Sequence, residues 1–109
     1  MRKLTGVFFL APLVAMAAPS PMATQEINHL FAYLKNSGCE FQRNNSWYTT
    51  TDAAAHLQTK YDYLIKKDRI SSAEDFIELA ATESSMSGKP YRVKCADGAS
   101  VNSGLWFRD

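Results

Sequence analysis

The sequence has no large excess of charge of either sign, and this limits the partners it can bind. Its 109 residues include 12 Lys and Arg and 11 Asp and Glu, a formal net charge of +1. Without Arg2 and Lys3, which lie in a segment that we expect to be removed, 10 basic and 11 acidic side chains remain. A nucleic-acid surface needs an excess of Lys and Arg gathered on one face. We therefore expect no nucleic-acid partner.

A long apolar run is also missing. The uncharged run from Leu4 to Met16 is shorter than the roughly 20 apolar residues of a membrane-spanning helix. Arg2 and Lys3 precede it, and Ala15-Met16-Ala17 has the small-x-small spacing that signal peptidase accepts. We expect residues 1–17 to be a signal peptide cleaved after Ala17, a periplasmic address, and no membrane span in the mature chain.

Cysteine is scarce, with only Cys39 and Cys95, and both follow the expected cleavage site. An exported chain with two cysteines usually oxidises them to one bridge, so we predict a Cys39–Cys95 disulfide. A zinc site that adds His29 and His56 would lack the short paired ligand spacing of known sites. We expect no metal and no cofactor.

Proline and glycine mark the boundaries of the predicted domain. The stretch APSPMA at 18–23 suggests an extended Pro-rich tether, and residues 24–109 show neither a repeat nor a second domain. In the segment after Thr24, which can cap a helix, apolar residues follow helical spacing up to a stop at Gly38: Ile27, Leu30, Phe31 and Leu34. Asn44-Asn45 next predicts the tight turn of a β-hairpin.

Two more helices and a strand are predicted downstream. From Thr51 the apolar residues Ala54, Leu57, Tyr61 and Leu64 form a helical stripe. Ser72 can cap a third helix, which runs to the serines at 84 and 85, and YRVKC alternates as a strand from 91 to 95. We predict an α+β fold, with about three helices packed on a small antiparallel sheet and stapled by the disulfide.

The stretch ESSMSGKPYRVKC, residues 83–95, suggests catalytic motifs that its spacing does not match. The residue three before Lys89 is Met86, so the Ser-x-x-Lys arrangement of acyl enzymes is missing. Pro90 stands where a phosphate-binding loop would need Ser or Thr. The loop is then either a structural corner between helix and strand or a recognition loop that uses Ser85, Ser87, Lys89 and Tyr91.

His56 and Lys60 lie one turn apart on the second predicted helix, so they share a face. The pair can form an anion site, or His56 can act as a general base. A histidine beside an apolar stripe more often has a structural hydrogen bond. Arg43 can pair with Glu40 or Asp52, or reach the same face as His56.

Several segments together resemble the YfeK-like family of small exported bacterial proteins, a family of unknown function. The resemblance covers residues 25–106 and rests on Arg43-Asn44, His56-Leu57 with Lys60, residues 73–77, and SS-x-SGKPY at 84–91. It implies a periplasmic address and one small domain, with no established activity. Relatives are expected to continue past Trp106 into a further amphipathic segment, so we expect the apolar residues 105–107 to be exposed.

The leading functional hypothesis is a non-enzymatic binding or interaction module of the bacterial envelope, with an envelope protein or a small ligand as partner. An alternative is a lysozyme inhibitor, because Ser87-Gly88-Lys89-Pro90-Tyr91 resembles the Ser-Gly-x-x-Tyr signature of one family of such inhibitors, whose members are all-β. A third is a small hydrolase that uses His56 and one of the serines.

Overall fold

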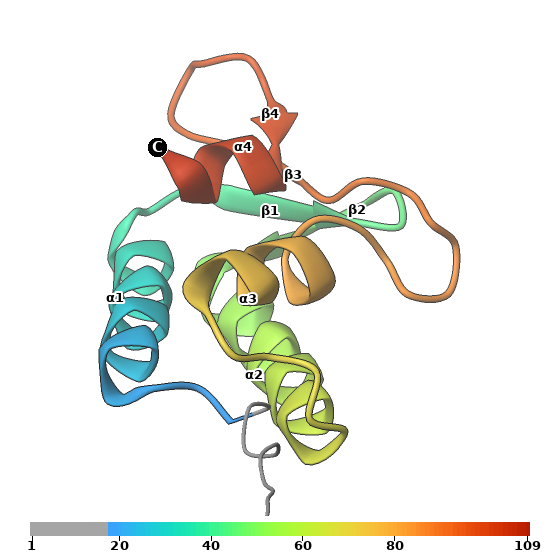
Figure 1. Ribbon diagram of the computed structural model, residues 1–109. Coiled ribbons are helices and arrows are strands. Elements are labelled where there is room, and N and C mark those ends of the chain that lie inside the picture. Colours follow the sequence, from blue (N-terminus) through green and yellow to red (C-terminus); the bar gives the residue numbers. More distant parts are fainter. Residues whose placement is uncertain (1–17) are drawn as a thin grey trace, which may run out of the picture.

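The computed structural model describes residues 18–109. The predicted signal peptide, residues 1–17, lies outside the described part. The element order is α1, β1, β2, α2, α3, β3, β4, α4, and the four strands form one antiparallel sheet in the order β2-β1-β3-β4. In Figure 1 the helices α1, α2 and α3 lie together below the sheet, and α4 lies beside β3 and β4. The predicted α+β class is confirmed.

Helix α1 spans Pro21–Asn36 and begins four residues earlier than predicted. The cap is Ser20, not Thr24: the Ser20 side chain accepts a hydrogen bond from the Ala23 backbone N–H, and Pro21 takes the first turn, where no N–H partner is needed. Half of the predicted Pro-rich tether at 18–23, namely residues 21–23, therefore lies in the helix. Gly38, at φ +69°, supplies the predicted left-handed residue after the helix.

The predicted hairpin joins β1 (Glu40–Arg43) to β2 (Ser46–Thr49). Both turn residues have positive φ, 51° at Asn44 and 72° at Asn45, as a two-residue turn of this hand requires. The register pairs Arg43 with Ser46 directly across that turn. This geometry places Arg43 at the end of the strand, close to the turn.

Helix α2 spans Thr50–Lys66 and α3 spans Ala73–Ala80. Helix α2 begins one residue before the predicted Thr51, with Thr49 as its cap. Ser72 caps α3 as predicted, because its hydroxyl accepts from the Asp75 N–H. Three of the four residues in the predicted stripe of α2 are buried, and the tyrosine is partly exposed. The amphipathic pattern therefore predicted which face of α2 meets the core.

Strand β3 covers Arg92–Lys94 and β4 covers Val101–Asn102, and a fourth helix, α4, covers Ser103–Arg108. The expectation of an exposed apolar end is wrong for Phe107, which is 4% exposed and packs its ring 6.3 Å from that of Phe76. Trp106 is partly buried and Leu105 is exposed. Folding residues 103–108 into a helix turns the Phe107 side chain toward the core.

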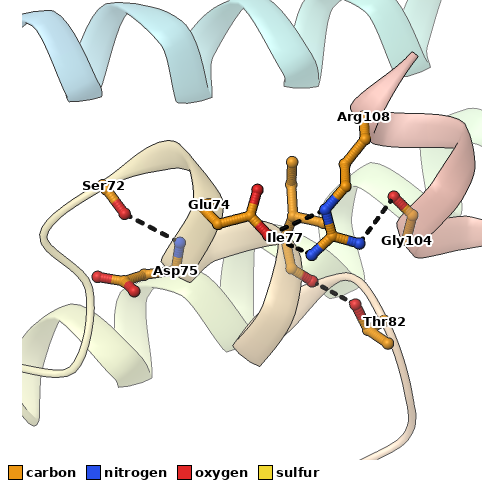
Figure 2. Close-up of polar contacts among 7 residues, drawn as sticks. All are labelled: Ser72, Glu74, Asp75, Ile77, Thr82, Gly104 and Arg108. Carbon is orange, nitrogen blue, oxygen red and sulfur yellow. Dashed lines mark hydrogen bonds and ion pairs between the residues drawn. The ribbon is translucent and has the colours of Figure 1, made fainter.

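An ion pair holds α4 against α3. Arg108 donates to the Glu74 carboxylate at the start of α3 and to the Gly104 carbonyl within α4, and Figure 2 shows the guanidinium between the two. The pKa of Glu74 is lowered, first by its hydrogen bond from Arg108. Just beyond α3, the Thr82 hydroxyl donates to the Ile77 carbonyl.

The core lies between the helices and the sheet, and the disulfide closes one end of it. Cys39 and Cys95 are bonded, with their Cα atoms 4.2 Å apart. The bridge confirms the predicted pairing and rules out these two thiols as zinc ligands. Within residues 18–109, no helix combines the length and the apolar character that crossing a membrane requires.

Candidate functional site

The site is organised around the hydroxyl group of Tyr91, the residue before β3. The Tyr91 side chain is 1% exposed and its ring packs 5.1 Å from that of Phe41 on β1. Its hydroxyl oxygen lies 3.1 Å from His56 Nε2 and 3.3 Å from Lys60 Nζ. The ring therefore belongs to the core, and the hydroxyl joins the core to two basic side chains of α2.

Lys60 bridges two segments. Its ammonium group donates to the Glu83 carbonyl at 2.8 Å and to the Tyr91 hydroxyl, and it lies 5.0 Å from the centroid of the Tyr91 ring. Burial lowers the pKa of Lys60, and the nearby Glu83 carboxylate partly opposes this effect. An ammonium group has three N–H donors. One donor of Lys60 therefore remains for a ligand.

His56 faces the same hydroxyl from one turn earlier on α2. Burial lowers its pKa below the ordinary value, and the charges of Arg43 and Lys60 lower it further. Burial also raises the pKa of Tyr91, so the phenol keeps its proton. When His56 is neutral with its proton on Nδ1, the Tyr91 phenol can donate to Nε2 while its oxygen accepts from Lys60.

Arg43, the last residue of β1, reaches the site without an ion pair. Its guanidinium carbon lies 5.2 Å from the centroid of the Tyr48 ring. Neither predicted partner, Glu40 or Asp52, pairs with it, and within residues 18–109 its guanidinium has no hydrogen-bonded acceptor. Glu40 is three positions earlier on the same strand and so points to the opposite face of the sheet. Asp52 lines a small cavity with Arg43 but makes no ion pair with it.

A groove of about 500 Å³ opens over these residues. It lies between the β1–β2 turn, α2 and the loop that follows α3. Its lining consists of Arg43, Asn44, His56, Thr59, Lys60, Tyr63, Ser84, Ser85, Met86 and Tyr91. Two cationic side chains and a histidine are present, and no carboxylate lines the groove. The volume falls within the roughly 300–1,000 Å³ of small-molecule sites.

Hydrogen bonds hold the segment after α3, residues 84–90, which we call the serine loop. Ser84 is buried, and its hydroxyl oxygen accepts from the backbone N–H groups of Met86 and Ser87. The Ser87 hydroxyl donates to Asn44 Oδ1 at 2.6 Å, which ties the loop to the β1–β2 turn, and the two segments lie together at the right of Figure 1. Gly88 takes a positive φ of 73°. These contacts are those of a structural corner.

The predicted site residues therefore separate into two groups. The groove contains Arg43, His56, Lys60, Ser85 and Tyr91. Ser87 is used in the loop's own hydrogen bonds, and the exposed Lys89 does not line the groove.

The ring of Tyr91, one of the residues predicted for a recognition loop, is buried in the core. The alternation of Tyr91 and Val93 on one face of the strand was the signal for this burial, since side chains two apart on a strand share a face. In the Ser-Gly-x-x-Tyr stretch, residues 87–90 are exposed and the Tyr91 ring is buried. The lysozyme-inhibitor alternative would therefore have to act without an exposed tyrosine ring.

Two apolar residues of the groove were not predicted from the sequence. Tyr63 lies on α2 two turns after His56, and Met86 lies in the serine loop. The i, i+7 spacing of His56 and Tyr63 places them on one helix face and was a usable signal. Met86 carries no local signal, because its place in the groove depends on how the loop folds back.

Within the residues that the structure describes, no hydrogen bond joins His56 to a serine. His56 Nε2 contacts the Tyr91 phenol, the hydroxyl groups of Ser84 and Ser87 bond within the loop or to Asn44, and Ser85 lines the groove. The same residues contain no group of three His, Cys, Asp or Glu side chains placed to hold a metal ion. The groups that line the groove therefore include two cations, a histidine, hydroxyl groups and apolar side chains.

A second, larger hollow of about 620 Å³ lies between α1, α3 and α4. Its floor is apolar, with Leu30, Ile77 and Phe107, and its cation Arg108 is already paired with Glu74. This hollow therefore contains charges of both signs, whereas the groove beside Tyr91 contains only positive ones. We take the groove as the candidate site, although it is the smaller of the two.

Comparison with known proteins identifies the family of the chain and one similar protein. The model of the "Family of unknown function (DUF5329)" matches residues 21–109, and the chain belongs to that family. The chain is also 33% identical over 86 residues, 78% of its length and 70% of the relative's, to the "Uncharacterized protein YfeK" of Salmonella typhimurium strain LT2. The resemblance to the YfeK-like family is thus confirmed. No solved structure matches the chain.

Proposed function

We propose that this protein is a non-enzymatic binding module of the bacterial envelope, and that the groove beside Tyr91 binds an anionic group of its ligand. One observation carries the proposal: Arg43, His56 and Lys60 line a groove that contains no carboxylate. An anion there gains charge-assisted hydrogen bonds, and the carboxylates nearest to the two cations, Asp52 and Glu83, do not line the groove. The envelope address is supported by the N-terminal sequence pattern and by a disulfide, which is typical of exported proteins.

The site offers the anion preformed donors. The guanidinium of Arg43 has five N–H groups, and none donates to an acceptor within residues 18–109. Lys60 is held in place by Glu83 and Tyr91 and keeps one donor. Groups fixed before binding reduce the entropy cost of association.

Calorimetric titration of the purified, disulfide-bonded protein with small carboxylates and with inorganic phosphate tests the binding function. A charged hydrogen bond contributes about 1.5–3 kcal/mol, so we expect Arg43→Gln and Lys60→Met each to weaken binding roughly 10-fold to 100-fold. The matched control is Lys89→Gln, which removes an exposed loop cation outside the groove. Equal weakening by all three substitutions would show a nonspecific charge effect and would contradict the proposal.

Export is tested on the full chain. In a bacterial host we expect the protein in the periplasmic fraction, with a mass that lacks residues 1–17. Intact protein retained in the cytoplasm would overturn the envelope assignment and leave the anion site to be judged on its own titrations.

A further inference from the structure

The lining of the groove contains more than basic groups. Met86 is 96% exposed and Tyr63 is 59% exposed, and both line the same groove as Arg43 and Lys60. They come from the serine loop and from α2, so the fold brings together two large apolar side chains that are far apart in the sequence. Apolar surface beside convergent polar groups is the usual composition of a small-molecule site.

The available donors favour a planar, singly charged headgroup. A guanidinium presents a fork that matches the two oxygens of a carboxylate, and Lys60 can add one further donor. His56, held neutral by burial and by its two cationic neighbours, contributes no third full charge at neutral pH. The Glu83 carboxylate lies near enough to Lys60 to offset part of its charge.

The apolar residues can accept a hydrocarbon chain. Methionine is flexible and polarisable, so Met86 can adjust to a chain of varying shape, and the Tyr63 ring gives a flat surface beside it. Exposure of these apolar side chains to water is unfavourable. A hydrocarbon chain that covers them would bury apolar surface of both the protein and the ligand, which is favourable.

We propose that the ligand is a single-chain carboxylate, with its headgroup between Arg43 and Lys60 and its hydrocarbon chain over Tyr63 and Met86. This inference rests on the proposed function, because it assigns the chemical class of the same anion. It adds the claim that affinity increases with chain length, which a simple anion site does not require.

The test is titration with acetate, octanoate and dodecanoate, each below its micelle concentration, with dodecyl phosphate as a second headgroup. Burial of about 0.8 kcal/mol per methylene corresponds to roughly a 15-fold change for two carbons when burial is complete, so an open groove should give at least about threefold per two carbons. Dodecyltrimethylammonium has the chain with a positive headgroup and should not bind.

Variants separate the two parts of the site. Met86→Ser and Tyr63→Ser should weaken dodecanoate binding at least about fivefold and leave acetate binding unchanged, whereas Arg43→Gln should weaken both. Leu105→Ser is the matched control, because Leu105 is an exposed apolar residue outside the groove. Circular dichroism and melting temperature check that each variant is folded.

The outcomes distinguish the two proposals. If acetate and dodecanoate bind equally well through Arg43, the chain assignment is overturned and the anion site stands. Tight binding of dodecyl phosphate without binding of dodecanoate would overturn the carboxylate assignment. If none of the anions binds, both proposals are wrong, and binding of the cationic amphiphile alone would also contradict both.

Discussion

Replacing Tyr91 separates the contribution of its ring from that of its hydroxyl group. The ring is buried against Phe41, and the hydroxyl contacts His56 and Lys60. Tyr91→Phe keeps the ring and removes only the hydroxyl contacts. Tyr91→Ala removes both and leaves a cavity in the core.

The two substitutions should differ clearly in free energy of unfolding. Truncating a buried aromatic residue to Ala costs about 3–5 kcal/mol. Loss of a hydroxyl group whose partners keep some solvent contact costs about 1 kcal/mol, because Lys60 retains the Glu83 carbonyl. In a domain of this size 1 kcal/mol changes Tm by roughly 4–8 °C. We therefore expect about 4–8 °C for Tyr91→Phe and at least about 12 °C for Tyr91→Ala.

Thermal and urea unfolding, followed by circular dichroism, measure both values. Tyr63→Ala is the matched control, because that tyrosine is exposed in the same groove and its loss should change stability by less than about 0.5 kcal/mol. Equal losses for Tyr91→Phe and Tyr91→Ala would refute the argument that the ring is a core residue. The Tyr91→Phe variant should still bind carboxylates, but with lower affinity, because Lys60 loses its hydrogen bond to the Tyr91 hydroxyl.

Three further predictions concern the bridge, pH and α4. Reducing the Cys39–Cys95 disulfide, which joins residues 56 apart, should lower the free energy of unfolding by about 4 kcal/mol in urea titrations with and without reductant; an unchanged midpoint would contradict this. Since His56 has a lowered pKa in the fold, the unfolded chain binds more protons just below pH 6.5, so stability should fall as pH drops through that value. His56→Asn should flatten this part of the pH profile, and an unchanged slope would count against the assignment. Arg108→Ala should lower Tm slightly at low salt, through loss of the exposed pair with Glu74, and the difference should vanish in 1 M NaCl; a large effect that persists in salt would show another role.

Local sequence signals predicted most of the fold where the physical cause is itself local. The cap at Ser72 and the turn at Asn44-Asn45 depend on side-chain and backbone preferences within a few residues, and both were predicted correctly. The start of α1 was missed because the two prolines of residues 18–23 suggested an extended chain. Ser20 followed by Pro21 is in fact a helix-start pattern.

Helix α4 and part of the site could not be predicted in this way. A helix of six residues is too short to show a periodic pattern, and it depends on tertiary contacts such as the burial of Phe107 and the pairing of Arg108 with Glu74. The His56–Lys60 pair was predictable from helical spacing. The contacts of His56 and Lys60 with the Tyr91 hydroxyl were not predictable, because they depend on how the serine loop leads back to the sheet.

The most direct test of the binding site is an NMR titration of the disulfide-bonded protein with dodecanoate, followed through backbone amide shifts. We expect saturable shifts at Asn44, Ser85 and Met86 and at the α2 residues that line the groove, and we expect Arg43→Gln to need at least about tenfold more dodecanoate to reach the same shifts. Shifts confined to the hollow between α1, α3 and α4, near His29 and Glu74, or no saturable shifts at all, would contradict it.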